Sequence, residues 1–295
     1  MPPDPMPPDP TPPDPTPLPP DPATAAVRAL CRGREWRVSE YLCTAGPGDI
    51  AFEERHDEVA IAAVIAGTFT YRADAGSAVL YPGALLLGNA GTCYQCGHEH
   101  GRGDRCISFQ AATEYFAEVA ASMAGSSRFR FPAPMLPATP SLLPRLVGIE
   151  ARTAFAAADA DETAARLLEA VIGVMSDQTP NPVRVSPRDR QRIGEALRYI
   201  ELHVADALDL DTLAGVAIMS KYHFVRTFRH IVGMTPYQFL LDLRLRRTAV
   251  RLATSAAPVS AIAFESGFGD LSTFNARFRR TFGMSPTAFR CRGQT

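Results

Sequence analysis

The sequence predicts an α+β chain in which an antiparallel β-barrel with flanking helices precedes an all-helical part. Residues 34–110 consist of short apolar runs separated by glycine and proline, which is typical of small antiparallel barrels or sandwiches. From about residue 112 the apolar residues recur at spacings of three and four, as they do in amphipathic helices. Residues 188–292 then contain a helical unit that occurs twice.

The chain of 295 residues is long enough for two domains of ordinary size. Residues 1–23 hold 13 of the 26 prolines in a loose P-P-D-P repeat, and we expect a disordered, polyproline-like tail there. The stretch "DQTPNPVRVSP" (177–187) contains three prolines and predicts an interdomain linker. The remaining predicted parts are a β-rich domain at 24–111, a helical region at 112–176 and a helical domain at 188–292.

The charges are distributed unevenly along the chain. Residues 1–183 contain 13 arginines and 22 acidic residues, whereas residues 184–295 contain 17 basic and 9 acidic residues. Such a split indicates a basic half that meets a polyanion, with nucleic acid as the leading candidate, although a solvated basic surface is the alternative.

The composition also indicates in which cellular compartment the protein is expected. No window of eighteen apolar residues occurs, so we expect no membrane span. The N-terminus lacks the layout of a signal peptide, and the expected location is the cytoplasm. Six cysteines are too few for a disulfide scaffold and are expected to be thiols or ligands.

The repeated helical unit has the layout of a helix-turn-helix. Its two copies are "LAGVAIMSKYHFVRTFRHIVGMTP" (213–236) and "IAFESGFGDLSTFNARFRRTFGMSP" (262–286). Each copy runs from a short helix through a tight turn and an N-capping residue into a second helix, which a glycine ends before a proline begins the next helix. The caps, stops and helix-starting prolines are Ser220, Asp270, Gly233, Gly283, Pro236 and Pro286. In such a unit the second helix enters the major groove of DNA.

On these residues the chain resembles the AraC/XylS family of bacterial transcription regulators, over about residues 190–291. The most specific stretch is "VSAIAFESGFGDLSTFNARFRRTFGMSPTAFR" (259–290). The resemblance implies a sequence-specific DNA-binding regulator, not an enzyme, with a long helix at about 236–253 between the two units. It also implies promoter DNA and RNA polymerase as partners, a bacterial nucleoid location and a homodimer.

The second helix of each unit is expected to bury one stripe and to present the other face to DNA. In the first unit Phe224 and Phe228 face the core, and Arg226 is expected to pair with guanine. In the second unit Asn275 is expected to hydrogen-bond adenine. Ser272, Thr273 and Arg280 are expected to contact phosphates. The expected DNA-binding residues are Lys221, Tyr222, Val225, Arg226, Arg229, Leu271, Ser272, Thr273, Asn275, Arg279 and Arg280, with solvated surface side chains as the alternative for the polar ones.

The β-rich region resembles the cupin-like effector and dimerisation domain found in this family. His56, Glu58 and Gly67 resemble the first cupin motif, and "YPGALLLGNAG" (81–91) resembles the second. Glu58 stands where a second histidine would complete the metal set, which argues against an intact cupin metalloenzyme. A metal-dependent cupin enzyme fused to a DNA-binding module is the alternative function. The helices of 141–176 are expected either to form the surface between protomers or to pack against the barrel.

Residues 93–106, "CYQCGHEHGRGDRC", concentrate sulfur and imidazole in the sensing half. Cys93 and Cys96 have the spacing of a thiolate pair, and His98, His100 or Cys106 would complete a tetrahedral zinc site. A Cys93–Cys96 disulfide formed under oxidant is a second hypothesis. The third is a β-hairpin whose cysteines pack as small hydrophobic side chains. No cofactor is certain on this basis: a metal ion at the cluster is one alternative, and the effector, a small molecule or a redox signal, is unidentified.

Overall fold

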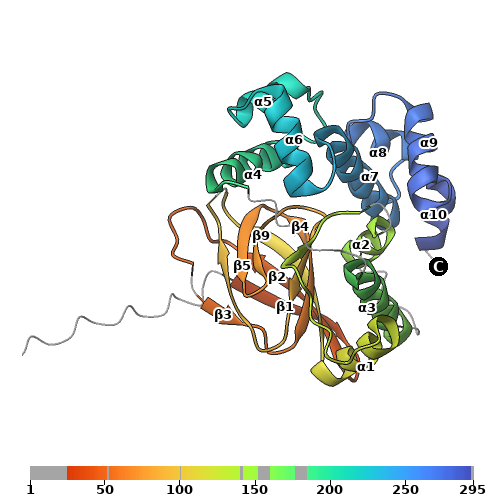
Figure 1. Cartoon of the computed structure of the whole chain (residues 1–295). Coiled ribbons are helices and arrows are strands. Elements are labelled where there is room, and N and C mark those ends of the chain that lie inside the picture. The colour runs from red at the N-terminus through yellow and green to blue at the C-terminus, as the bar shows by residue number, and fades with distance from the viewer. Residues whose placement is uncertain are drawn as a thin grey trace, which may run out of the picture.

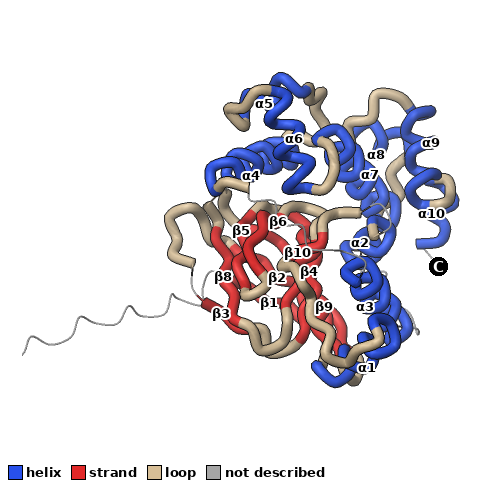
Figure 2. Tube along the Cα trace, viewed as in Figure 1, coloured by secondary structure: helices blue, strands red, loops and turns tan. Residues whose placement is uncertain are grey.

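The computed structural model of the 295-residue chain describes residues 25–51, 53–99, 101–139, 142–151, 160–176 and 185–293. A β-rich part lies below seven helices, α4 to α10, and α1 to α3 run along one side of it (Figures 1 and 2). The predicted tail at 1–23 and most of the predicted linker lie outside the described residues.

In the described residues, ten strands form two antiparallel sheets. The six-stranded sheet has the order β1-β2-β9-β4-β7-β10, and the four-stranded sheet has the order β3-β8-β5-β6. The strands are β1 Ala25–Arg32, β2 Trp36–Cys43, β3 Glu53–Arg55, β4 Val59–Ala66, β5 Phe69–Ala73, β6 Gly76–Leu80, β7 Leu85–Gly88, β8 Cys93–Gly97, β9 Asp104–Ala111 and β10 Met135–Leu136.

The structure thus has two separate sheets where the sequence predicted a barrel. The chain crosses between the two sheets at several tight connections. Two crossings meet back to back at Gly67 and Gly103, whose φ angles are 87° and 74°. A Cβ on Gly67 would lie 2.5 Å from the carbonyl oxygen of Gly103, so the two backbones touch where a side chain has no room. The Pro82–Gly83 turn forms a third crossing, between β6 and β7.

Strand β4 is buried on both faces, which explains its unbroken apolar sequence VAIAAVIA. Val64 packs between the sheets with Phe69, Tyr71 and Leu80. Ile61 and its neighbours on the other face join the cluster that the helices cover. The core therefore has two layers, one between the sheets and one between the larger sheet and the helices.

Helices α1 Thr113–Ala124, α2 Leu143–Glu150 and α3 Ala160–Ser176 cover the larger sheet. Leu168, Val171 and Ile172 of α3 are fully buried in the cluster against the sheet. Leu143 and Val147 of α2 instead join the core of the second helix-turn-helix unit. The apolar faces of these two helices are thus covered within the chain, which matches the packing alternative. Strand β10, which falls between α1 and α2, was not expected.

The C-terminal helices are α4 Pro187–Leu202, α5 Leu210–Val216, α6 Lys221–Val232, α7 Pro236–Thr254, α8 Val259–Glu265, α9 Leu271–Phe282 and α10 Pro286–Gly293. The long helix expected at about 236–253 is α7. None of the helices in the described ranges combines the length and apolar character of a membrane span.

The β-rich part is joined to these helices by both apolar and polar contacts. Val79, Tyr81 and Ala84 belong to one apolar cluster with residues of α4 to α7. The Tyr81 hydroxyl donates to the carbonyl oxygen of Val232 at 2.9 Å. The backbone NH of Gly67 donates to the Glu201 carboxylate of α4 at 3.0 Å. The two halves therefore share a continuous interface.

Candidate nucleic-acid interface

Helices α5 and α6 form the first helix-turn-helix unit. The Ser220 hydroxyl accepts a hydrogen bond from the backbone NH of His223, which makes it the N-cap of α6. Gly233 ends the helix in the left-handed conformation, and Pro236 begins α7 within a capping box. Phe224 and Phe228 are fully buried, as the spacing predicted. The opposite face of α6 is thereby fixed toward solvent.

Helices α8 and α9 repeat this arrangement. The Asp270 carboxylate accepts from the backbone NH of Thr273 at 2.6 Å, and these hydrogen bonds lower the pKa of Asp270. Gly283 ends α9 as Gly233 ends α6. In the turns, Ile218 of the first unit and Gly267 of the second have positive φ angles of 50° and 89°. The same turn conformation is thus built once with glycine and once with a β-branched residue.

The predicted DNA-binding side chains lie mostly on exposed faces of α6 and α9. Tyr222 is 79% exposed, and Val225 and Leu271 are half-buried. The exposed polar members are Lys221, Arg226, Arg229, Ser272, Thr273, Asn275, Arg279 and Arg280. The polar members of each predicted set are therefore accessible on α6 and α9.

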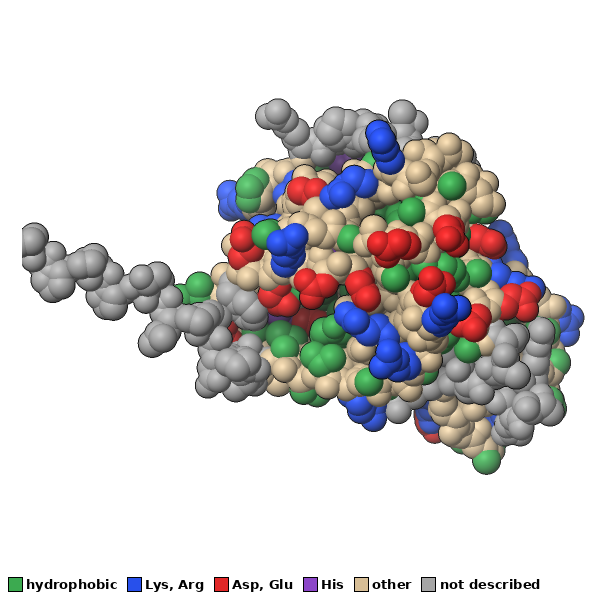
Figure 3. Space-filling model, turned by 90° about the horizontal axis from the view of Figure 1, so that it is seen from below, with side chains coloured by type: hydrophobic (Ala, Val, Ile, Leu, Met, Phe, Trp, Pro, Cys, Tyr) green, Lys and Arg blue, Asp and Glu red, His purple; other side chains and the backbone are tan. Residues whose placement is uncertain are grey.

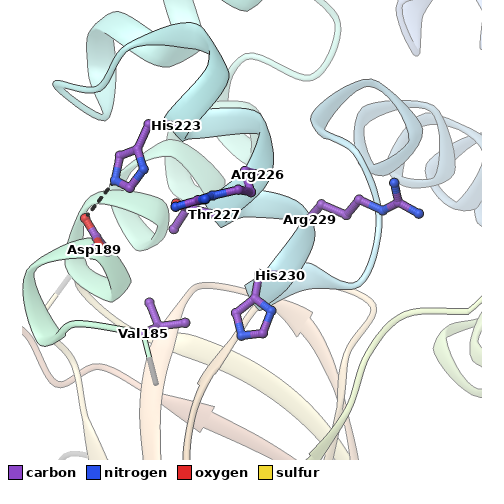
Figure 4. A pocket seen from close by; sticks show the side chains of 7 residues that line it. All are labelled: Val185, Asp189, His223, Arg226, Thr227, Arg229 and His230. Carbon is purple, nitrogen blue, oxygen red and sulfur yellow. Dashed lines mark hydrogen bonds and ion pairs between the residues drawn. The ribbon is translucent and has the colours of Figure 1, made fainter. Parts of the chain in front are cut away.

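A hollow of about 570 Å³ opens beside α6 and α4. Figure 4 shows His223 facing Asp189 of α4, with Nε2 and Oδ1 3.4 Å apart, while Arg229 extends to the other side of α6. The lining residues are Val185, Asp189, His223, Arg226, Thr227, Arg229 and His230. The hollow is therefore lined by two predicted DNA-binding residues, Arg226 and Arg229, and by two histidines.

The face of the β-rich part that points away from the helices carries acidic side chains beside several basic ones (Figure 3). The recognition helices lie on the opposite side (Figure 1).

Two further side chains lie near the predicted face of the second unit: the Arg277 guanidinium lies 5.9 Å from the ring centroid of the exposed Tyr237. Sequence reasoning missed this pair, because Tyr237 belongs to α7 and not to a recognition helix.

The residues of the sulfur- and imidazole-rich stretch do not converge as one set. Cys93 and Cys96 both lie on β8, three positions apart, so their side chains point to opposite faces. Cys93 is exposed, and Cys96 is half-buried against the cluster that contains Tyr71 and Cys106. Burial raises the pKa of the Cys96 and Cys106 thiols well above the usual range, which disfavours reactive thiolates. His100 lies outside the described residues.

His98 makes a different set of contacts from the one predicted. Its Nε2 lies 2.6 Å from Oδ2 of Asp104, and both side chains are almost fully buried. Burial lowers the pKa of His98, but hydrogen bonds to Asp104 and Cys43 outweigh it and raise the pKa to about 9. Cys43, His98 and Asp104 are the one group of potential metal ligands that converges among the described residues.

Two residues that resemble the first cupin motif, His56 and Glu58, do not belong to this group in the described part of the chain. His56 is buried, and its Nε2 lies 2.7 Å from the Tyr71 hydroxyl while its ring stacks on Tyr94 at 4.1 Å. Burial lowers the pKa of His56 to about 4, against the raising effect of nearby aspartates. Glu58 instead pairs with Arg37 at 3.3 Å. His56 is therefore a neutral core side chain at neutral pH.

Comparisons with known proteins match the helical half. A helix-turn-helix domain family matches residues 213–292. The probable transcriptional regulator LumQ of Photobacterium leiognathi is 35% identical over 91 residues, which cover 31% of this chain and 37% of LumQ. Regulatory protein SoxS of Salmonella typhimurium is 31% identical over 103 residues, which cover 35% of this chain and 96% of SoxS. The solved DNA-binding domain of the transcriptional factor AdpA, in complex with a target DNA, is 33% identical over 34% of this chain and 90% of that chain, with a TM-score of 0.33.

These similarities and the two capped recognition helices define the class of helix-turn-helix DNA-binding transcription regulators. Within this class, the chain belongs to the AraC/XylS family. The match spans about a third of the length of LumQ, whereas it covers nearly all of SoxS.

Proposed function

We propose that the protein regulates transcription by placing α6 and α9 in successive major grooves of promoter DNA, with its β-rich part receiving the signal that controls binding. The observation that carries this proposal is the repeated unit itself. Two helices with matching caps and glycine stops each bury an aromatic stripe and expose a basic face. Two such helices reach one face of B-DNA when they are spaced by about one turn, roughly 34 Å.

The shared interface supports the signal-receiving role of the β-rich part. The Tyr81 hydroxyl holds the carbonyl at the end of α6, and the Glu201 carboxylate of α4 holds the backbone of Gly67. A rearrangement of the β-rich part would therefore act directly on the helices that support the first recognition helix. RNA polymerase and a second copy of the chain are the partners that this role requires of a promoter-bound regulator.

Binding of the full chain to genomic DNA fragments, measured by fluorescence anisotropy over a range of salt concentrations, tests the proposal. Specific binding should weaken steeply with salt, because each phosphate contact releases counterions. Arg226→Ala and Arg279→Ala should each weaken binding, whereas Arg166→Ala, in an exposed i,i+4 ion pair on α3, should not. Equal, salt-insensitive affinity for every sequence would overturn the proposal.

A further inference from the structure

Three potential metal ligands meet where the two sheets join. Cys43 is the last residue of β2, Asp104 is the first residue of β9, and the strand register places them directly opposite each other. His98 directly follows β8 of the other sheet, and its Nε2 lies 2.6 Å from Oδ2 of Asp104. One ligand atom from each of the three side chains lies within 4.8 Å of the other two.

Backbone contacts help to hold this arrangement. The Gly103 NH donates to the carbonyl oxygen of Ala45 at 2.7 Å, which ties the connection to the end of β2. A Cβ on Gly103 would lie 2.7 Å from the Cys43 carbonyl oxygen, so only glycine fits there. The Phe69 ring stacks on the His98 imidazole at 5.7 Å and fixes the plane of the ring. The site is therefore preorganised.

The donor set is the one that zinc prefers. A thiolate, an imidazole and a carboxylate each bind Zn²⁺ at about 2.0–2.3 Å, and three protein ligands leave the fourth tetrahedral position open. The Cys106 thiol donates to Oδ1 of Asp104 at 3.2 Å, which orients the carboxylate while its Oδ2 faces His98. The carboxylate and the imidazole are both almost fully buried and pair with each other at 2.6 Å.

Two of the three side chains, Cys43 and Asp104, border a cavity next to the DNA-binding half, and the buried His98 lies behind them. This cavity of about 390 Å³ is lined by Cys43 and Asp104 on one side and by Arg198, Glu201 and Leu202 of α4 on the other. Gly67, which also lines it, is the residue whose NH binds Glu201. An ion or ion-bound ligand in this cavity would therefore touch the contact between the two halves.

We propose that Cys43, His98 and Asp104 bind a zinc ion whose open position faces the α4 cavity, and that its occupancy changes DNA affinity through the Gly67–Glu201 contact. The second clause rests on the proposed function, whereas the first does not. The site differs from the sequence-based hypothesis, because Cys43 and Asp104 take the places expected for Cys93 and Cys96.

Metal binding is tested on the full chain after chelation, by competition with a chromophoric chelator and by the absorption of the cobalt-substituted protein. We expect one zinc per chain, a sulfur-to-cobalt charge-transfer band, and at least about a tenfold loss of affinity in Cys43→Ser and Asp104→Asn. Cys93→Ser, an exposed thiol on β8, is the matched control and should bind zinc as the wild type does. Should Asp104→Asn fail to fold by circular dichroism, Cys43→Ser at the half-buried end of β2 carries the test.

A wild-type chain that retains no zinc against the chelator, or loss of zinc in Cys93→Ser but not in Cys43→Ser, would overturn the site. The coupling is tested by DNA anisotropy with and without zinc. Zinc should shift the DNA affinity of the wild type, and Glu201→Gln should bind zinc but lose that shift. Zinc binding with unchanged DNA affinity would overturn the coupling alone. A failure to bind any DNA would refute the proposed function, while the cobalt spectrum would still report on the site.

Discussion

Arg246 of α7 and Glu150, the last residue of α2, form an ion pair of 2.8 Å between the DNA-binding helices and the N-terminal half. The same guanidinium donates through Nη2 to the carbonyl oxygen of Ile65 in β4, at 2.7 Å. Arg246 is only 3% exposed, so a charged side chain is buried at the centre of the interface and satisfied from both sides.

Arg246→Met should destabilise the protein, because it leaves the Glu150 carboxylate and the Ile65 carbonyl without their donor. Breaking a buried pair of this kind costs about 3–5 kcal/mol. The free energy of unfolding, measured by urea denaturation, should fall accordingly. Arg251→Met is the control on the same helix, since the ion pair of Arg251 with Glu265 is half-exposed and contributes about 0–1 kcal/mol. Equal losses in the two variants would contradict this assignment.

The two helix-turn-helix turns should respond to substitution in opposite directions. Ile218→Gly should raise the free energy of unfolding by up to about 1 kcal/mol, because glycine removes the cost of a left-handed conformation. Ile218 is 71% exposed, so little packing is lost. Gly267→Ala should destabilise, because its Cβ would lie 2.9 Å from the backbone of Ala205. Thermal melts of both variants measure the change in stability. A destabilised Ile218→Gly would show that the backbone at Ile218 is not strained.

His56 should make stability depend on pH. Its folded-state pKa of about 4 lies below the ordinary value of 6.5, so the unfolded chain takes up a proton that the folded chain refuses. The stability contributed by the neutral imidazole is complete above pH 6.5 and is lost as pH falls toward 4, by about 2–3 kcal/mol. Urea denaturation of wild type and His56→Gln across this window should show the extra slope only in the wild type. If the stability of the two proteins changed with pH in parallel, burial of His56 would not be the cause of the pH dependence.

The two recognition helices should divide between base and phosphate contacts. Arg226→Ala should cost about 1–3 kcal/mol and relax the preference at one base position. Asn275→Ala should relax the preference for adenine at a position in the other half of the site. Arg280→Ala should weaken binding to all sequences alike and reduce the salt slope by about one. Selection of bound sequences from a random library separates these outcomes, and uniform weakening in Arg226→Ala would make that residue a phosphate contact.

Local signals predicted the helical half well. Ser220, Asp270, Gly233 and Gly283 act within one helical turn of their own positions, so a cap or a stop is readable from a few neighbouring letters. The spacing is less regular at the end of α6, where Val232 is fully buried and Ile231, three residues after Phe228, is half-buried.

The candidate metal site could not be predicted from the sequence, because Cys43 lies far from the other two candidate ligands along the chain. Cys43 and Asp104 meet only because β2 pairs with β9, and sequence periodicity does not reveal which strands pair. The C-x₂-C spacing suggested a turn, but β8 runs straight through it, and a strand sends Cys93 and Cys96 to opposite faces. The Arg246 contacts, too, depend on the docking of two halves and leave no local trace.

The apolar cluster that unites Val79, Tyr81 and Ala84 with the helices around Phe239 has a thermodynamic consequence. Two domains that share a core cannot melt independently without exposing that core to water. Differential scanning calorimetry of the full chain should therefore show a single endotherm whose calorimetric and van't Hoff enthalpies agree. The helical half, expressed alone, would begin with this apolar surface uncovered, so we expect it to melt at a lower temperature than the full chain.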